Sequence, residues 1–179
     1  MEQFNSIDDD FFMDEIRVYN AGLIISWPFF TQFFEQLELM NNGEFIEVSS
    51  RNRAIYLLQY LAYNHIEFPE YELVLNKILV GIPMQDHVKP IEQLTLEETN
   101  MASSLMNGLI LNWEKVKNSS IEGIQETFFQ REGILSFHQD FNKLMIPKRG
   151  VDILVEFIPW KLSLIKLPWM EKPLHIEWI

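Results

Sequence analysis

Histidine beside a carboxylate is the pattern in this chain with the clearest potential for chemistry, because both side chains can bind a metal ion. Examples are His65 with Glu67, Asp86 with His87, and His138 with Asp140. The zinc-protease pattern H-E-x-x-H is absent, and the H-x-E pattern of zinc deaminases needs a cysteine pair that a chain without cysteine cannot supply. We therefore predict that the histidines are surface residues and that the chain holds no metal or other cofactor.

The spacing of the glycines argues against a phosphate-binding loop. They stand at positions 22, 43, 81, 108, 123, 133 and 150, so neither G-x-G-x-x-G nor G-x-x-x-x-G-K is present, and the G-x-S-x-G nucleophile elbow is also absent. With 26 acidic residues, a pair of carboxylates can always be chosen, so their number alone is not evidence for a glycosidase-like site. We predict a non-enzymatic protein, and an enzyme with a carboxylate site is a rival that rests only on this abundance of acids.

Charge is distributed unevenly along the 179 residues. Fourteen basic and 26 acidic residues give a formal net charge of −12. The first 50 residues contain ten acids and Arg17 as their single base, which is −9, and residues 51–179 carry the remaining −3. Nucleic acids and anionic membrane surfaces attract basic proteins, so we expect neither as a partner. No apolar run reaches the ~20 residues of a membrane-spanning helix, and we expect no membrane span.

Residues 1–14 are predicted to form an acidic, flexible tail, because the run Asp8–Asp10 repels itself. This segment has neither the basic nor the apolar part of a secretory signal, so a cytoplasmic protein is expected. Residues 15–179 are predicted to form a single globular domain.

The elements that must position any site begin as helices. Apolar spacing predicts a buried helix pair over residues 23–39, interrupted by Pro28, and further helices over residues 54–61, 71–80 and 95–116. Gly81 is expected to end the helix over 71–80. Thr95 with Glu98 has the spacing of a capping box, and Ser119 with Glu122 repeats it before a helix that reaches about Gln130.

The pattern then changes to that of strands. Residues 16–19 alternate near the start of the chain, residues 133–137 and 143–146 indicate a hairpin, and residues 161–167 and 174–178 alternate again. Residues 151–157 fit either a helical turn or a strand. The prediction is an α+β fold, with several packed helices followed by a small C-terminal antiparallel sheet.

Aromatic residues are concentrated at the end of the chain. Trp160, Trp169 and Trp178 lie in the last 20 residues, and the first two follow a proline. Such residues fill a core, or they form a subunit interface, where tryptophan is enriched among hot spots. Both readings stay open. Lys166 is a candidate polar contact, because it stands between apolar neighbours on an expected strand.

Three long blocks, in order, resemble the tape measure proteins of bacterial contractile injection systems, which are phage-tail-like particles. They are residues 69–81 (PEYELVLNKILVG), residues 117–133 (KNSSIEGIQETFFQREG), and a C-terminal block with Pro159-Trp160, residues 165–170 (IKLPWM) and Glu177-Trp178. Weaker matches are Asn20-Ala21-Gly22, Trp27-Pro28-Phe29 and residues 57–61 (LLQYL). The resemblance covers about residues 18–178, and it adds Trp27 to the packing or interface candidates.

The resemblance implies a structural component that is made in the cytoplasm and incorporated in the injection particle. The partners that it implies are the inner tube, cap, sheath or baseplate proteins, and it suggests a homo-oligomer in a ring. Family members set tube length through an extended segment, whereas 179 residues would span only ~270 Å even if all were helical. We therefore expect an adaptor, plug or cap-associated subunit at one end of the tube. The alternative is a cytoplasmic chaperone or binding module for a particle component or exported cargo.

Overall fold

A computed structural model of the chain describes residues 14–179, and the predicted tail therefore lies, apart from Asp14, outside the described residues. Helical elements dominate the first two thirds. In order they are η1 (Ala21–Phe29), α1 (Phe30–Gln36), α2 (Val48–Tyr63), η2 (Glu70–Glu72), α3 (Val74–Val80), α4 (Leu96–Asn112), η3 (Glu114–Val116), α5 (Ile121–Ile124) and η4 (Gln125–Phe129).

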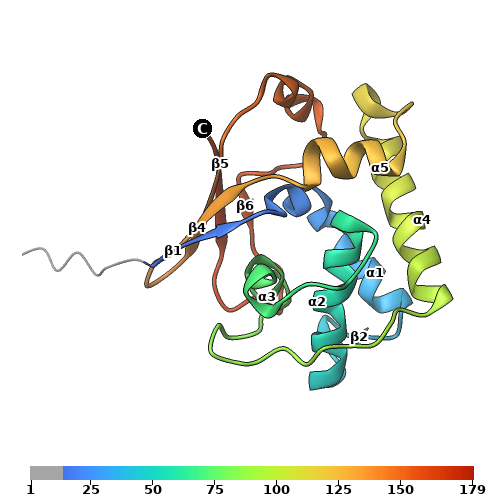
Figure 1. Cartoon of the computed structure of the whole chain (residues 1–179), viewed down its shortest axis with the longest axis vertical. Coiled ribbons are helices and arrows are strands. Elements are labelled where there is room, and N and C mark those ends of the chain that lie inside the picture. Colours follow the sequence, from blue (N-terminus) through green and yellow to red (C-terminus); the bar gives the residue numbers. More distant parts are fainter. Residues whose placement is uncertain (1–13) are drawn as a thin grey trace, which may run out of the picture.

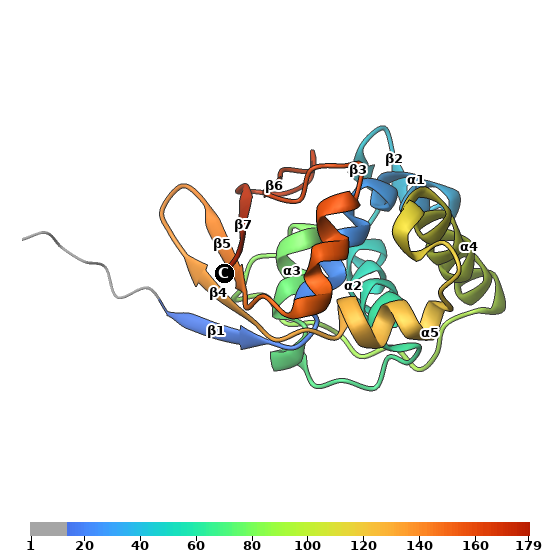
Figure 2. The same cartoon turned by 90° about the horizontal axis from the view of Figure 1, so that it is seen from above.

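The strands form a sheet beside these helices. They are β1 (Glu15–Val18), β4 (Gly133–Phe137), β5 (Asn142–Ile146), β6 (Leu164–Ile165) and β7 (Leu174–Trp178), and a further helical segment, η5 (Gly150–Phe157), follows β5. A separate two-stranded hairpin joins α1 to α2 through β2 (Met40–Asn41) and β3 (Glu44–Phe45). The large sheet lies on one side of the molecule and the helices on the other (Figures 1 and 2). The α+β prediction is confirmed.

The sheet differs in one respect from the antiparallel sheet expected at the C-terminus. Its order is β1-β4-β5-β7-β6, and the β5–β7 pair is parallel. The other three pairs are antiparallel. A parallel pair requires a crossover connection, and η5 and β6 provide it between the ends of β5 and β7. The N-terminal strand β1 also completes the sheet, by pairing with β4 115 or more residues later in the chain.

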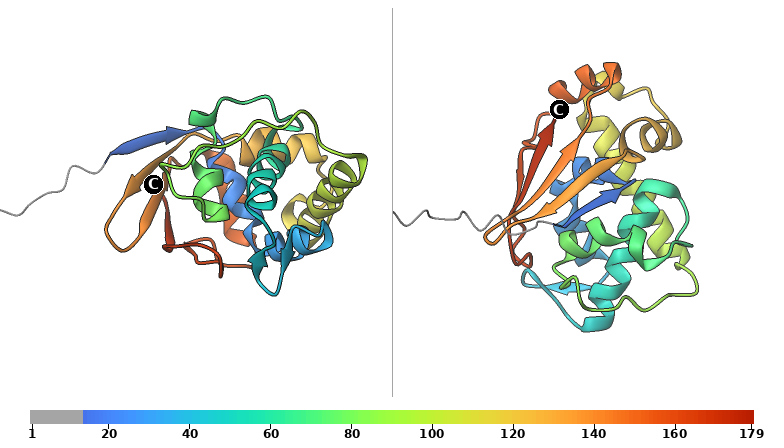
Figure 3. Two further views of the ribbon diagram at one scale, coloured as in Figure 1. Left: turned by 90° about the horizontal axis from the view of Figure 1, so that it is seen from below. Right: turned by 60° about the vertical axis from the view of Figure 1, so that its left-hand side comes forward.

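One row of apolar side chains crosses the sheet and joins it to the helices. Ile16 pairs with Leu135, Leu135 with Leu144, and Leu144 with Ile176. The last three are buried and belong to one hydrophobic cluster with residues from the helices. The cluster therefore spans both layers, which the right-hand view of Figure 3 shows side by side.

Close backbone approach and buried amides hold the helices together. An added Cβ at Gly22 would lie 1.6 Å from the Phe128 carbonyl oxygen, so η1 and η4 can approach this closely only with glycine at this position. Asn20 Nδ2 donates to Gln59 Oε1 at 2.8 Å and to Asn76 Oδ1 at 2.7 Å, and all three side chains are buried. These bonds link the start of η1 to α2 and α3.

Two of the predicted helix signals are confirmed, one is wrong, and the helix predicted over residues 54–61 is longer, since α2 begins at Val48. Gly81 ends α3 in the left-handed conformation, at φ +74°, and Thr95 forms the capping box with Glu98. The second box does not form as predicted, because Ser119 N–H closes the preceding turn by donating to the Val116 carbonyl. Ser120 caps α5 instead, by accepting from Gly123 N at 3.0 Å.

The remaining predictions concern shorter segments. Residues 71–80 divide into η2 and α3 at Leu73, and residues 150–157 are helical rather than extended. The expected strand over residues 161–167 shortens to β6. Three of the four histidines are exposed, and His138 is half-buried against Phe141, with 4.1 Å between ring centroids.

Candidate functional site

The C-terminal aromatic residues contact the N-terminal helices. Trp27, in η1, donates its indole N–H to the Lys161 carbonyl at 2.8 Å. Trp160 donates its own indole N–H to the Ile25 carbonyl at 2.9 Å. The Trp160 ring also meets the Phe29 ring edge-on, with centroids 5.4 Å apart. The two tryptophans thus join η1 to residues 160–161 in both directions.

Trp169 lies deeper, and 8% of its surface is exposed. Its indole N–H donates to the Leu79 carbonyl of α3 at 2.8 Å. Its ring packs edge-on against Phe34 and Phe45, with centroids 6.1 and 5.6 Å away. The indole therefore joins α1, the β2–β3 hairpin and α3.

Trp178, at the end of β7, has a different environment. Its ring lies 5.8 Å from the guanidinium carbon of Arg131, which is buried. Its indole nitrogen is also buried, but no acceptor for it is present among residues 14–179. Trp178 is therefore not part of the Trp27–Trp160 contact.

Arg131 and Asp152 form a buried ion pair beneath Trp178. Arg131 Nη1 and Nη2 donate to the two carboxylate oxygens of Asp152 at 2.6 and 2.8 Å, and Arg149 N–H adds a third bond at 2.7 Å. Burial alone raises the pKa of Asp152, but the hydrogen bonds from Arg131 and Arg149 and the nearby positive charges outweigh it. The pKa of Asp152 is consequently held below its ordinary value, and the pair is ionised at neutral pH.

Lys166 follows β6 directly, and its ammonium group bonds within its own loop. Nζ donates to the Met170 carbonyl at 2.5 Å and lies 3.5 Å from the Leu167 carbonyl. The residue is exposed. Its contact with a partner stays a prediction, as do the interface roles of the four tryptophans Trp27, Trp160, Trp169 and Trp178.

Sequence reasoning passed over three residues of this region. Arg131 and Asp152 pair across 21 positions, and no local spacing links them. Trp113 was included only in the helix predicted over residues 95–116, yet it is fully buried and donates its indole N–H to the Leu154 carbonyl at 2.9 Å. The burial of a lone arginine gives no signal in sequence, whereas a buried indole N–H usually finds a hydrogen-bond acceptor.

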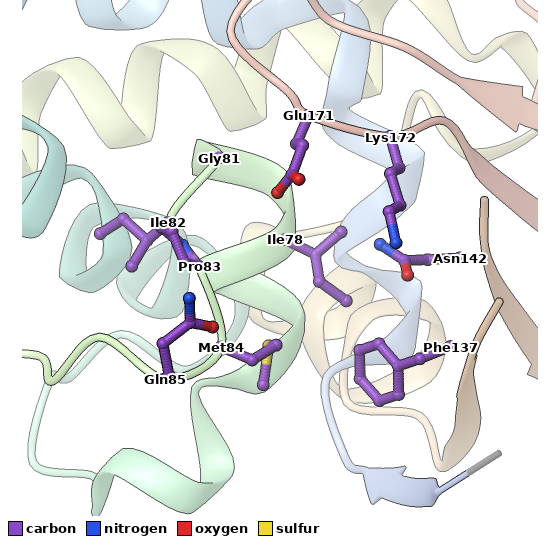
Figure 4. A pocket seen from close by; sticks show the side chains of 10 residues that line it. All are labelled: Ile78, Gly81, Ile82, Pro83, Met84, Gln85, Phe137, Asn142, Glu171 and Lys172. Atoms are coloured by element: carbon purple, nitrogen blue, oxygen red, sulfur yellow. The ribbon is translucent and has the colours of Figure 1, made fainter. Parts of the chain in front are cut away.

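A first cavity, of about 350 Å³, lies between the end of α3 and the sheet (Figure 4). Apolar side chains, including Ile78, Ile82 and Phe137, form much of its lining, and Glu171 and Lys172 contribute opposite charges. Lys172 Nζ donates to the His138 carbonyl at 3.1 Å. The lining contains no serine or histidine side chain that would form a nucleophile–base pair.

A buried lysine positions the loop that forms one wall of this cavity. Lys77 Nζ donates to the carbonyls of Met84 and Asp86 at 2.9 and 2.5 Å, and lies 3.3 Å from Glu70 Oε1. Burial raises the pKa of Glu70, but the Val88 N–H bond and the Lys77 ammonium group outweigh it, so the pKa is lowered overall. The loop is therefore held by charge-assisted bonds.

A second cavity, of about 280 Å³, lies between η5 and the β7 side of the sheet, and we name it the β7 groove. Its lining is mostly apolar and consists of Val155, Ile158, Trp160, Leu162, Ile176 and Trp178, together with Lys148, Asp152, Glu156 and Ser163. Four exposed apolar residues belong to the same part of the chain but lie outside this lining, namely Ile153, Phe157, Leu164 and Ile179. An apolar groove of this kind is typical of a binding surface.

Metal-binding clusters and membrane-spanning helices are both absent from the residues that the structure describes. Among residues 14–179, no group of three or more histidine, aspartate or glutamate side chains is placed to hold a metal ion. None of the helices described there is long and apolar enough to cross a membrane.

Comparison with known proteins gives one match. A family model described as "Contractile injection system tape measure protein" matches residues 5–178. Neither the curated proteins nor the solved structures contain a match to this chain.

Proposed function

This chain belongs to the contractile injection system tape measure protein family, and from that membership we propose that it is an assembly subunit at one end of the inner tube. It would act there as an adaptor, plug or cap-associated subunit, in a ring of identical copies, after assembly in the cytoplasm. Members of this family are structural components of the injection particle, and the tube or sheath proteins of the particle are the implied partners. The observation that carries the proposal is the match of one family model to residues 5–178.

The packing of the family-like blocks supports an end-binding role for this domain. The C-terminal block contacts the block over residues 69–81 through the Trp169–Leu79 hydrogen bond. An added Cβ at Gly81 would lie 2.2 Å from the Trp169 carbonyl oxygen, so the two blocks touch along their backbones. The blocks thus contribute to one packed core. A segment that measures length must be extended, whereas these contacts favour a compact body that anchors or closes a tube.

The test is to purify particles from the native host and examine them by mass spectrometry and cryo-electron microscopy. The chain should be present, with density for its domain at one end of the tube, and its deletion should change the number or length of particles. A chain absent from purified particles, with normal particles after deletion, would overturn the proposal.

The chaperone or binding module is the second candidate, and the β7 groove favours it. An apolar groove on an acidic protein suits transient capture of a particle component or cargo. This candidate predicts a complex with that component in cell extracts and no copy of the chain in finished particles. The same purification therefore separates the two candidates.

A further inference from the structure

One edge of β7 is only partly paired. β6 pairs with Leu174 and His175, and the Ser163 carbonyl accepts from Ile176 N–H at 2.9 Å. On the opposite side, Ile179 bonds to the Ile146 carbonyl and to Lys148 N–H. Backbone groups alternate along a strand, so the N–H and C=O of Trp178 face the β6 side. No strand among residues 14–179 pairs with them there. Such an edge is a template for an added strand.

The β7 groove lies along this unpaired edge. Trp178 contributes both the free backbone groups and part of the apolar lining, and its buried indole nitrogen has no acceptor among the described residues. An extended segment that pairs with Trp178 would place alternate side chains in the groove, which is how strand addition obtains specificity. The occupant should therefore be extended and partly apolar.

Charge identifies the occupant further. Residues 142–179 contain six bases and four acids, which is a net charge of +2. Because the whole chain has a net charge of −12, residues 1–141 have a net charge of −14. Of the groove's own charged residues, Asp152 pairs with Arg131, which leaves Lys148 as the one base and Glu156 as the one further acid in the lining. The segment that best fits an apolar groove in the basic part of the chain is residues 1–14, which have five acids, no base, and the apolar run Phe11-Phe12-Met13.

We propose that residues 1–13 of one copy bind the β7 groove of a second copy, as a strand added beside Trp178. Phe11 and Met13, which share one face of a strand, supply the apolar side chains, and the neighbouring aspartates lie near Lys148. This contact deepens the ring assembly proposed above, for which it supplies the joint between neighbouring subunits.

The topology favours a second copy over the same copy. β1, which follows the segment directly, forms the opposite edge of the large sheet from β6, as the strand order and Figure 2 show. To reach its own groove, the segment would have to cross at least three strand spacings, roughly 14 Å, and then follow the length of β7 to Trp178. Phe11 stands only four residues before β1 and can therefore reach at most about 14 Å from it. A contact between opposite edges of two copies uses a different surface on each copy. Each copy therefore keeps one surface free for a further copy, and repetition of the contact gives a closed ring or a filament.

Sedimentation velocity of the purified full-length chain tests the contact. The wild type should associate as its concentration rises. Val155→Glu, which puts a charge in the groove, and the double variant Phe11→Ser/Phe12→Ser should each remain monomeric at concentrations where the wild type associates. Ile153→Glu is the matched control, because Ile153 lies on the same η5 helix, is 62% exposed and is not part of the lining. It should associate like the wild type.

A second groove variant guards against a folding defect. Lys148 is exposed, so Lys148→Glu should leave the unfolding transition unchanged and weaken association at least several-fold. A monomeric wild type, or equal effects of Ile153→Glu and Val155→Glu, would overturn the proposal.

Mixing the variants distinguishes a contact between copies from one within a copy. Val155→Glu retains a working N-terminal segment, and Phe11→Ser/Phe12→Ser retains a working groove. Their equimolar mixture should therefore form a 1:1 dimer and nothing larger. A mixture that stays monomeric would overturn the proposal in favour of binding within one copy. The sedimentation and mixing experiments use the purified chain alone. If the chain were absent from particles, the proposed function would be overturned, whereas the measured association of the purified chain would still stand.

Discussion

Trp27 and Trp160 join two segments that lie more than 130 residues apart in sequence. The Trp27 indole N–H donates to the Lys161 carbonyl at 2.8 Å, and the Trp160 indole N–H donates to the Ile25 carbonyl at 2.9 Å. The pair fixes the C-terminal crossover against η1. Both rings are half-buried, and Trp160 also packs against Phe29. The position of the β7 groove, which Trp160 lines, consequently depends on a residue in the N-terminal helices.

Replacing either tryptophan by phenylalanine should test this coupling. Each single variant loses one hydrogen bond and leaves a carbonyl unpaired, so it should lower the free energy of unfolding by about 1–2 kcal/mol. Because both bonds hold the same two segments, the double variant should cost less than the sum, with a coupling of about 0.5–1 kcal/mol. Urea unfolding of the four proteins measures it. Strict additivity would show that the two bonds act independently.

Gly81 and Gly43 form a matched pair for testing the contact between α3 and the C-terminal block. Both have positive φ, +74° and +79°, but an added Cβ meets the Trp169 carbonyl only at Gly81, and nothing at Gly43. Gly43→Ala should cost about 1–2 kcal/mol for the left-handed conformation alone. Gly81→Ala should cost about 1–3 kcal/mol more, because the backbone must shift. Equal losses in urea unfolding would contradict the contact.

Local signals in the sequence predicted the helices well. The Thr95–Glu98 box and the Gly81 stop depend on neighbouring residues and formed as expected. Ser119 and Ser120 are both reasonable caps, and the choice between them depends on the preceding turn, whose length no spacing rule gives.

Contacts between distant residues were not predictable in the same way. The parallel β5–β7 pair follows from the path of η5 and β6, and a strand pattern carries no information about its partner's direction. Trp160 and Trp169 became candidates because tryptophans are concentrated near the C-terminus, but their acceptors are backbone carbonyls far away in sequence, which no side-chain pattern marks. The β7 groove is visible only once residues 148–178 are folded together.

The corrected cap gives a direct prediction. Ser120→Ala should lower the free energy of unfolding by about 1 kcal/mol, because Gly123 N–H loses its acceptor. Ser119→Ala should have little effect, since Ser119 contributes only its backbone N–H to the preceding turn. Both serines are exposed, so packing does not confuse the comparison. A larger loss of stability for Ser119→Ala than for Ser120→Ala, measured by thermal unfolding, would instead support the predicted Ser119–Glu122 capping box.

Asp152 should make stability depend on pH. The hydrogen bonds and charge of Arg131 lower the pKa of Asp152 in the folded protein below the value of about 3.9 in an unfolded chain. A lowered folded pKa gives stability that is fully present above the unfolded pKa and is lost as the pH falls toward the folded one. Asp152→Asn should therefore be less stable than the wild type at pH 7, and the difference should shrink below about pH 4.

Glu114 is the control for this titration. It also has a lowered pKa, through its hydrogen bond to Lys117, but both side chains are exposed. Exposed ion pairs contribute little to stability. Glu114→Gln should therefore follow the wild-type curve between pH 7 and pH 3, and an equal effect of the two substitutions would contradict the importance of burial.

Trp169 allows its packing role to be separated from a role at an interface. Trp169→Phe keeps a ring near Phe34 and Phe45 but leaves the Leu79 carbonyl unpaired, so it should cost about 1–3 kcal/mol of unfolding free energy. Trp169→Ala removes the ring as well and should cost about 3–5 kcal/mol. If Trp169 instead contacts a neighbouring subunit, both variants would unfold like the wild type and would be lost from purified particles. Urea unfolding and particle composition, measured on the same two variants, decide between these results.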